Sequence, residues 1–163
     1  MKYVLIGKIV NTHGLKGELR IISDFKYKKY VFKKDMKIYI GKNKTCEVIN
    51  SYRYHKIYDM ITLVGYNNID EVLKYKGEYV FINKEDLTLG KNEYLDEDLI
   101  GLKVYVDEEL KGTVKKIENY KNNSLLVVRN NDKDYLIPYN FDIIKEIDLK
   151  KKQIYINDIE GLF

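Results

Sequence analysis

The sequence contains few of the residues on which enzymatic and metal sites depend. Its 163 residues include one cysteine, two histidines and three arginines. The single cysteine, Cys46, excludes an internal disulfide and is consistent with a reducing cytosol. The histidines, His13 and His55, do not have the spacing of metal ligands with each other or with Cys46. We therefore expect no metal and no cofactor.

The carboxylates do not suggest a catalytic pair either. They cluster at residues 93–98 and 107–109, in polar stretches that are typical of linkers and solvated turns. A nucleophile and its base would have to be brought together across the fold, which a sequence alone does not exclude. We expect a protein that is not an enzyme and has no catalytic residue, and we keep an RNA-modifying enzyme as the least supported alternative.

Long hydrophobic runs are also missing. No stretch of 18 apolar residues is present, so the sequence does not predict a membrane-spanning helix. The first residues do not follow the basic, apolar, small-residue order of a signal peptide. We therefore expect a cytoplasmic protein with no membrane partner.

Charge is present but is unevenly distributed. Residues 1–84 contain 17 Lys and Arg against 8 Asp and Glu, a net charge of +9, whereas residues 85–163 contain 12 against 17, a net charge of −5. The two values sum to the +4 of the whole chain. Such asymmetry favours nucleic acid as the partner of the first part and a basic partner for the second. Alternatively, these charges only maintain solubility.

The most informative segment is at residues 6–22. Two apolar runs, 3–10 and 19–22, flank a loop at 11–17, which predicts a β-hairpin. Gly14 and Gly17 can adopt a positive φ without steric cost, and Leu15 and Lys16 lie between them. The spacing fits neither a P-loop nor a dinucleotide fingerprint. Taken alone, the glycines and His13 are explained by turn structure as readily as by function.

The rest of the chain alternates between short apolar runs and turn residues. We expect a short helix after Asn68, which can form a capping box with Glu71, and its end near Gly77. A polar, acidic segment at 85–97 predicts a linker. Beyond the linker, apolar runs about ten residues apart favour a small antiparallel barrel. We expect strands at 37–40, 45–54, 60–64, 79–83, 103–106, 112–117, 124–129, 135–138 and 154–156.

Two sets of motifs resemble the ribosome maturation factor RimM family. The first is the turn His13-Gly14-Leu15-Lys16-Gly17-Glu18 between two strands near the start of the chain. The second set resembles the PRC-barrel domain that this family carries. It consists of the segment 98–104 (DLIGLKV), Gly112-x-Val114, Leu136-Ile137-Pro138 and Glu160-Gly161-Leu162. The resemblance implies a mainly β protein with two small antiparallel β-barrel domains, at 1–84 and 98–163, a linker at 85–97 and one short helix in the first domain.

The resemblance also implies a function. Proteins of this family are non-enzymatic assembly factors that bind the free small (30S) ribosomal subunit. They assist maturation of its head and processing of 16S ribosomal RNA. The PRC-barrel domain and linker are implied to bind the nineteenth protein of that subunit, which is basic, and the chain is implied to act as a monomer in the cytoplasm.

The family usually has Glu-Tyr-Tyr in the linker, and this chain departs from that pattern. The aligned residues are Glu93, Tyr94 and Leu95, so the second ring is lost. Leucine keeps an apolar contact but has no hydroxyl and no flat stacking face. The resemblance therefore implies partner binding by Tyr94 and, more weakly, by Leu95. The full set of candidate partner-binding residues is His13, Gly14, Leu15, Lys16, Gly17, Arg20, Tyr94 and Leu95.

A lysine- and aromatic-rich stretch at 25–34 is a further candidate for RNA contact. Lysines can neutralise phosphates, and exposed aromatic rings can stack on unpaired bases. In a chain with 16 tyrosines, however, most aromatic rings are expected in the core. The alternative function that we keep is a general RNA-binding β-barrel module without an assembly role.

Overall fold

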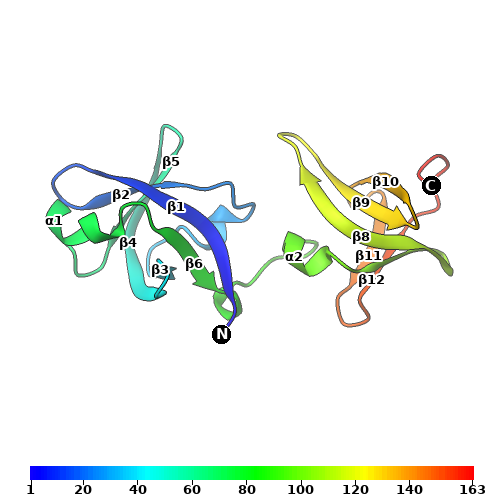
Figure 1. The fold of residues 1–163 in the computed structure, drawn as a ribbon, viewed down its shortest axis with the longest axis horizontal. Helices are drawn as coiled ribbons and strands as arrows, with labels where there is room; N and C mark the ends of the chain where they lie inside the picture. Colours follow the sequence, from blue (N-terminus) through cyan, green and yellow to red (C-terminus); the bar gives the residue numbers. More distant parts are fainter. The chain divides into compact units, whose positions relative to one another are not determined.

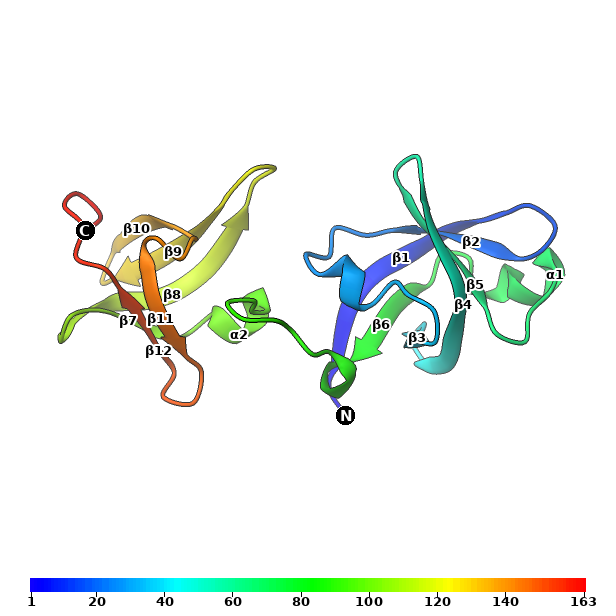
Figure 2. The same cartoon turned by 180° about the vertical axis from the view of Figure 1, so that it is seen from behind.

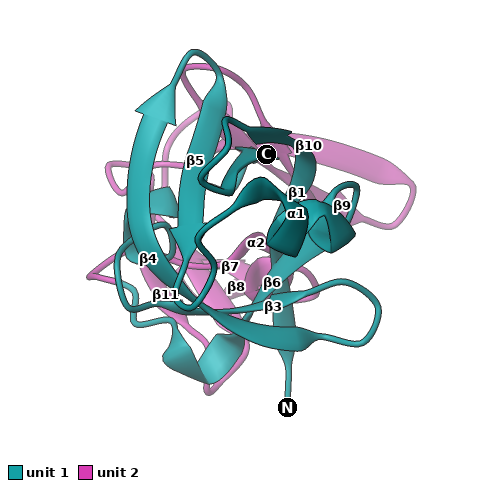
Figure 3. Cartoon of the chain, turned by 90° about the vertical axis from the view of Figure 1, so that its left-hand side faces the viewer, with its two compact units in different colours: residues 1–89 teal, residues 90–163 magenta.

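The chain folds into two separate bodies made mainly of β-strands, as the sequence predicts. The structure is a computed structural model that describes all residues from Met1 to Phe163. Contacts divide the chain into Met1–Leu89, called unit 1, and Gly90–Phe163, called unit 2 (Figure 3). Each unit is described by itself.

Unit 1 is a closed β-barrel (Figure 1). Its strands are β1 (Tyr3–His13), β2 (Glu18–Ile22), β3 (Lys37–Ile40), β4 (Thr45–His55), β5 (Tyr58–Leu63) and β6 (Tyr79–Asn83). Short helical turns are η1 (Lys28–Tyr30), α1 (Ile69–Val72), η2 (Leu73–Tyr75) and η3 (Lys84–Asp86). The strand order is β1-β2-β5-β4-β3-β6, and β6 pairs with β1 to close the barrel through antiparallel ladders.

Strand β1 makes the closure possible because it bends. Its register shifts between Leu5 and Gly7 against β6, and between Ile9 and Asn11 against β2. Irregularities of this kind bend a strand and increase its twist, so one long strand can pair on both sides around a small barrel. The second shift also corrects the expected loop at 11–17. Strand β1 continues to His13, and only residues 14–17 form the turn.

The core of unit 1 includes a buried carboxylate that is paired with a half-exposed lysine. Asp59 on β5 is fully buried, and Lys28 Nζ lies 2.8 Å from its Oδ2 atom. The hydroxyl of Tyr52 donates a hydrogen bond of 2.7 Å to the other carboxylate oxygen. Burial and this carboxylate raise the pKa of Tyr52. The pair therefore ties η1, which precedes β3, to the β4–β5 hairpin.

The helix after Asn68 forms as predicted. The side chain of Asn68 accepts a hydrogen bond from the backbone N–H of Glu71, and the Glu71 carboxylate accepts one from the backbone N–H of Asn68. This reciprocal capping satisfies donors that a helix start leaves without partners. Helix α1 is one turn long and is followed directly by η2, before Gly77.

Unit 2 is a six-stranded sheet with the order β10-β9-β8-β7-β12-β11 (Figure 2). Its elements are α2 (Asp96–Leu99), β7 (Lys103–Val106), β8 (Glu109–Asn119), β9 (Ser124–Asn130), β10 (Lys133–Pro138), β11 (Ile144–Asp148) and β12 (Gln153–Ile156). The expectation of antiparallel pairing throughout was wrong at one place. Strand β12 pairs with β7 in parallel, because the chain turns back after β11 and returns along the free edge of β7.

The buried side chains of unit 2 are all apolar. Leu99, the last residue of α2, is fully buried and packs with the sheet residues Val104, Leu126 and Ile154. Helix α2 therefore belongs to the hydrophobic core of unit 2, although its residues 96 and 97 fall in the segment that the sequence predicts as linker. No helix of the chain combines the length and the apolar character needed to cross a membrane.

Candidate functional site

The β1–β2 turn is held in place by the start of α1. Gly14 and Gly17 have φ values of 72° and 90°, and the backbone oxygen of Leu15 accepts a 2.9 Å hydrogen bond from the N–H of Ile69. A Cβ atom at Gly17 would lie 2.9 Å from the backbone oxygen of Asn68, whereas one at Gly14 would meet nothing within 4 Å. Figure 1 shows this turn beside α1. Gly17 is therefore required for close approach, and Gly14 only for its φ.

This anchoring leaves the tip of the turn exposed. The Leu15 side chain is 82% exposed, and Lys16 next to it is also exposed. The backbone that carries Leu15 is hydrogen-bonded to the start of α1. This exposed apolar side chain is therefore a preformed contact point. The turn can thus offer an apolar tip and one positive charge to a partner without first being ordered.

His13 and Arg20 lie next to this turn on the outer surface of the barrel. The Arg20 guanidinium donates a 2.5 Å hydrogen bond to Nδ1 of His13, so this nitrogen acts as the acceptor. The guanidinium carbon also lies 5.4 Å from the ring centre of Tyr58, within the range of a cation–π contact. The ring of His55 lies 6.1 Å from that of His13.

An ion pair completes the same surface. Arg53 donates two hydrogen bonds to Glu18, at 2.8 and 2.7 Å, in the two-pronged geometry typical of arginine and carboxylate. The hydrogen bonds from Arg53 lower the pKa of Glu18, although partial burial opposes them. We call the six residues His13, Glu18, Arg20, Arg53, His55 and Tyr58 the His–Arg cluster.

Of this cluster, the sequence marked His13 and Arg20 as candidate partner-binding residues and Glu18 only as part of the turn motif. His13, Glu18 and Arg20 lie in or beside the recognised turn, but Arg53, His55 and Tyr58 come from the β4–β5 hairpin. The pairing of β2 with β5, and of β5 with β4, places Arg20, Met60 and Arg53 in one row across three strands. No local sequence pattern predicts that register, because it depends on pairing between strands that are more than 30 residues apart in the sequence.

The chemistry of the His–Arg cluster is suited to binding an anion. It holds two of the three arginines of the chain. Arg53 is paired with Glu18, the only carboxylate of the cluster, which leaves the Arg20 guanidinium as its uncompensated positive charge. Guanidinium groups recognise phosphate and stack on flat rings. The structure contains no group of three or more His, Cys, Asp or Glu residues that could hold a metal ion.

Tyr94 and Leu95 belong to unit 2 and are not part of this cluster. The Tyr94 ring packs against the core of unit 2 and stacks on Phe141, with 6.4 Å between ring centres. Leu95, the N-cap residue of α2, is only 6% exposed. Tyr94 therefore retains some accessible surface for a partner, whereas the side chain of Leu95 presents very little.

The stretch at 25–34 is only partly available for RNA. Tyr27 and Phe32 are buried, so stacking of bases on these two rings is excluded. Lys28 is engaged by Asp59. Lys29, Lys33 and Lys34 are exposed and can contribute electrostatically, and the rings of Phe25 and Tyr30 are half-buried.

Unit 2 carries an acidic groove that sequence reasoning did not place. It encloses about 650 Å³ between the β7–β8 turn and the C-terminal segment. Its carboxylates are Asp107, Glu108, Glu109, Asp158 and Glu160, and its one basic residue is Lys111. The run at 107–109 was visible in the sequence, but the parallel pairing of β12 with β7 brings Asp158 and Glu160 to it.

Comparison with known families decides the relationship of the chain. The family model of the RimM N-terminal domain matches residues 4–87, and that of the RimM PRC barrel domain matches residues 96–162. The chain belongs to the RimM family. The resemblance seen in the two sets of motifs is thereby confirmed.

Relatives are similar over their full length. A protein of Bacillus cereus strain G9842 named "Ribosome maturation factor RimM" is 37% identical over 168 residues, which cover 99% of this chain and 98% of the relative. Proteins of the same name from Staphylococcus epidermidis and Shouchella clausii are 37% and 34% identical, over 98% and 96% of this chain and 98% and 95% of their own length.

The RimM domains divide the candidate residues in an informative way. The His–Arg cluster and the β1–β2 turn fall entirely within the match to the N-terminal domain. Asp107, Glu108, Glu109, Asp158 and Glu160 fall within the match to the PRC barrel domain. Tyr94 and Leu95 lie between the two matches.

Proposed function

We propose that this chain is a ribosome assembly factor. The observation that carries the proposal is similarity over 99% of the chain to proteins named ribosome maturation factor. Both family domains are present, in the order expected from the motifs. The proposed action is to hold a protein–RNA conformation during assembly, without catalysis.

The specific target that we propose is the free small (30S) ribosomal subunit. There the factor would assist maturation of the head and processing of 16S ribosomal RNA, as a monomer in the cytoplasm. It would leave when the mature conformation forms, because that conformation no longer offers the same surfaces.

Unit 1 is proposed to face RNA. Residues 1–89 contain 17 Lys and Arg against 10 Asp and Glu, a net charge of +7. The His–Arg cluster adds guanidinium groups, and the β1–β2 turn adds Leu15 and Lys16. Of the candidate residues, His13, Gly14, Leu15, Lys16, Gly17 and Arg20 would act here, with the glycines shaping the turn that carries the others.

Unit 2 is proposed to bind a basic protein, the nineteenth of the small subunit. Residues 90–163 contain 12 Lys and Arg against 15 Asp and Glu, a net charge of −3, and five of these carboxylates line the acidic groove. Opposite charge steers such partners together and raises the rate of association. Tyr94 would contact the partner directly, and Leu95 would act by supporting Tyr94 and α2. The division into 1–84, linker 85–97 and 98–163 stays a prediction.

The test of the assembly role is genetic. Deletion of the gene should cause unprocessed small-subunit RNA precursor to accumulate, and the wild-type gene should reverse this. A chain carrying Lys16→Ala and Arg20→Ala should restore processing only in part. Lys150→Ala with Lys151→Ala, in the β11–β12 turn, removes the same charge as a control. Absence of precursor after deletion would refute the role.

A general RNA-binding module is the second candidate, and the positive charge of unit 1 favours it. This function predicts similar affinities for unrelated RNAs, a steep loss of binding with salt, and no preference for free small subunits. An RNA-modifying enzyme would instead alter RNA during incubation with the pure protein. We expect the RNA to remain unchanged.

A further inference from the structure

A second outer surface of unit 1 carries aromatic rings that the His–Arg cluster does not use. Strands β1, β6 and β3 are neighbours in the barrel, and their register places Leu5, Phe81 and Tyr39 in one row. Tyr3 and Tyr79 lie beside this row on the same strands. We call the four rings of Tyr3, Tyr39, Tyr79 and Phe81 the aromatic face.

The aromatic face points away from the core. Residues that alternate with it on these strands, including Val4, Ile38 and Ile82, are buried in the barrel. Outward positions of such a sheet are usually polar, since they meet water. Here Tyr79 and Leu5 are 50% and 52% exposed, and Tyr3 is also exposed. An exposed group of this kind on a small domain marks an interaction surface.

Three of the four rings are linked by ring contacts through Tyr3. Tyr3 lies 5.2 Å from Tyr39 and 6.4 Å from Phe81 between ring centres, both with edge-to-face geometry. Each contact fixes the tilt of the next ring. The aromatic face is therefore a preformed support with several π-surfaces at one level of the sheet.

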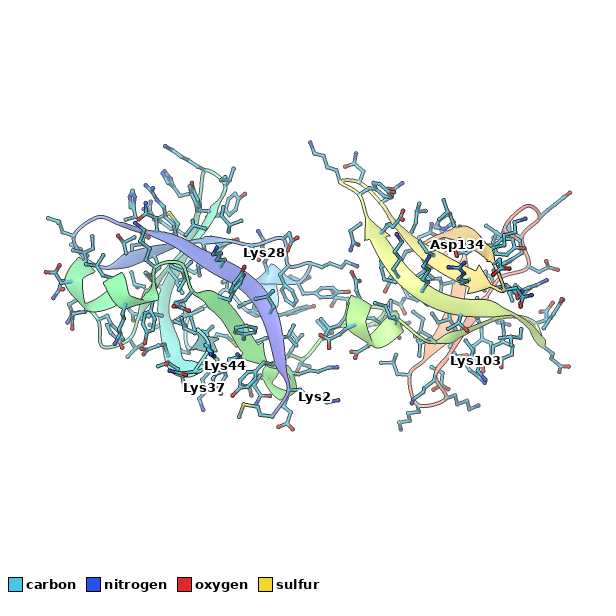
Figure 4. The ribbon with its side chains drawn as sticks, in the orientation of Figure 1. Lys2, Lys28, Lys37, Lys44, Lys103 and Asp134 are labelled. Atoms are coloured by element: carbon cyan, nitrogen blue, oxygen red, sulfur yellow. The ribbon has the colours of Figure 1, made fainter.

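The ammonium groups of two lysines lie close to the rings of the aromatic face. Lys44 Nζ lies 4.2 Å from the ring centre of Phe81 and 5.5 Å from that of Tyr3, and Lys8 Nζ lies 5.3 Å from that of Tyr79. Figure 4 labels two further lysines at these strands, Lys37 at the start of β3 and Lys2 just before β1. Two carboxylates are nearby: Asp86, which contributes after burial to the raised pKa of Tyr39, and Glu78, next to Gly41. Positive charge prevails on this surface.

We propose that the aromatic face binds single-stranded RNA. Unpaired bases would stack on the rings of Tyr39, Tyr79 and Phe81. The ammonium groups of Lys8 and Lys44 would swing from the ring faces to the phosphates. Rings combined with lysines are the means by which single strands are bound without sequence readout, since every base has a π-face. An apolar protein segment would gain nothing from ammonium groups placed over the rings, so RNA is the better occupant.

This proposal deepens the proposed function, because RNA of the maturing subunit would supply the single strand. It also adds a second RNA contact on different strands from the first. The His–Arg cluster lies on β2, β4, β5 and the end of β1, whereas the aromatic face lies on β3, β6 and the start of β1. One strand, β1, carries parts of both.

The test measures binding of the full-length protein to a fluorescent, unstructured RNA of about ten nucleotides, a length that suits a small β-barrel. Phe81→Leu keeps apolar volume but removes the flat ring, and should weaken binding about fivefold to tenfold. The matched control is Tyr120→Leu, which removes an exposed ring from unit 2 and should leave affinity unchanged. Equal affinities of wild type and Phe81→Leu would overturn the proposal.

Two further measurements distinguish a loss of RNA contact from a loss of folding. Lys44→Gln leaves all rings in place and should reduce the slope of log affinity against log salt concentration by about one. In protein labelled at its five phenylalanines, the ring signal of Phe81, assigned by its loss in Phe81→Leu, should move upfield when RNA is added. An RNA duplex of equal length should produce a smaller shift. Binding of RNA without movement of the Phe81 signal would place the strand elsewhere and overturn the proposal.

This test and the test of the proposed function can fail independently. If wild type does not bind free small subunits but Phe81→Leu has a weakened affinity for single-stranded RNA, RNA binding by the aromatic face is supported and the assembly role is refuted. If wild type binds small subunits and Phe81→Leu binds the short RNA as well as wild type does, the assembly role is supported and RNA binding by the aromatic face is refuted.

Discussion

Units 1 and 2 are each built on six strands, yet they solve the problem of strand edges differently. In unit 1 the first and last strands pair, so the barrel has no free edge. In unit 2 the outer strands of the sheet are β10 and β11, and β12 lies between β11 and β7 and pairs with β7 in parallel. Unit 1 also contains both of the chain's buried polar residues, Asp59 and Asn83, whereas the core of unit 2 is apolar.

The difference extends to the surfaces. Unit 1 has the guanidinium and imidazole groups of the His–Arg cluster and the rings of the aromatic face on the outside of a closed barrel. Unit 2 has its carboxylates around a groove between a hairpin turn and the C-terminal segment. One chain therefore carries two surfaces of opposite charge on two separately built cores.

The largest effect is expected in the core of unit 2. Leu99→Ala removes a fully buried side chain and should lower the free energy of unfolding of unit 2 by about 3 kcal/mol. Ile100→Ala, at a half-exposed neighbouring position, should cost less than about 1 kcal/mol. Amide hydrogen exchange should show faster exchange in unit 2 alone. Equal acceleration in unit 1 would mean that the units unfold together.

The second effect concerns the ion pair of unit 1. Lys28→Met leaves the buried carboxylate of Asp59 without its cation and should destabilise unit 1 by about 2 kcal/mol, less than a fully buried pair would because Lys28 is half-exposed. Asp59→Asn should cost less, since the freed ammonium of Lys28 can turn to water. Denaturant unfolding of both variants would show this order. The reverse order would mean that the ion pair contributes little.

The third change tests the two glycines of the β1–β2 turn. Gly17→Ala should cost about 2 kcal/mol, because it combines a positive φ with a Cβ that meets the backbone of Asn68. Gly14→Ala has open space and should cost only about 1 kcal/mol. Thermal unfolding would compare the two variants. A larger loss for Gly14→Ala would contradict the anchoring of the turn by α1.

The smallest effect is electrostatic. Arg53→Gln removes the hydrogen bonds that lower the pKa of Glu18, so this pKa should rise toward its ordinary value of 4.5. Because the folded pKa is lowered in wild type, the ion pair stabilises unit 1 above that value and the gain is lost as the pH falls through the folded pKa. Carboxyl NMR titration would measure the change. An unchanged pKa would mean that the pair is not formed in solution.

Local features of unit 1 could be predicted from the sequence. The capping box of Asn68 and Glu71 and the β3–β4 hairpin depend on residues a few positions apart, and both were found. The extent of β1 was not, because the shift at Asn11 lets the polar residues Asn11, Thr12 and His13 continue the strand. Here tertiary pairing overrides the turn propensity of asparagine.

The errors in unit 2 have a similar origin. Strand β11 was missed because its two buried residues, Ile144 and Ile147, are three positions apart, and the register shift between Ile144 and Glu146 interrupts the alternation. Helix α2 was missed because Asp96–Leu99 is a single turn in an acidic segment. The contacts of Arg53, His55 and Tyr58 with His13, Glu18 and Arg20 depend on the strand order, which no local pattern predicts. The same holds for the placing of Asp158 beside Asp107.

Sedimentation with purified ribosomal particles tests the central claim most directly. At moderate salt the chain should sediment with free small subunits, and not with large subunits or assembled ribosomes. Lys16→Ala with Arg20→Ala should weaken that binding, and so should Tyr94→Ala in unit 2. Equal binding to every particle, lost together as salt rises, would contradict the account and leave a basic RNA-binding module.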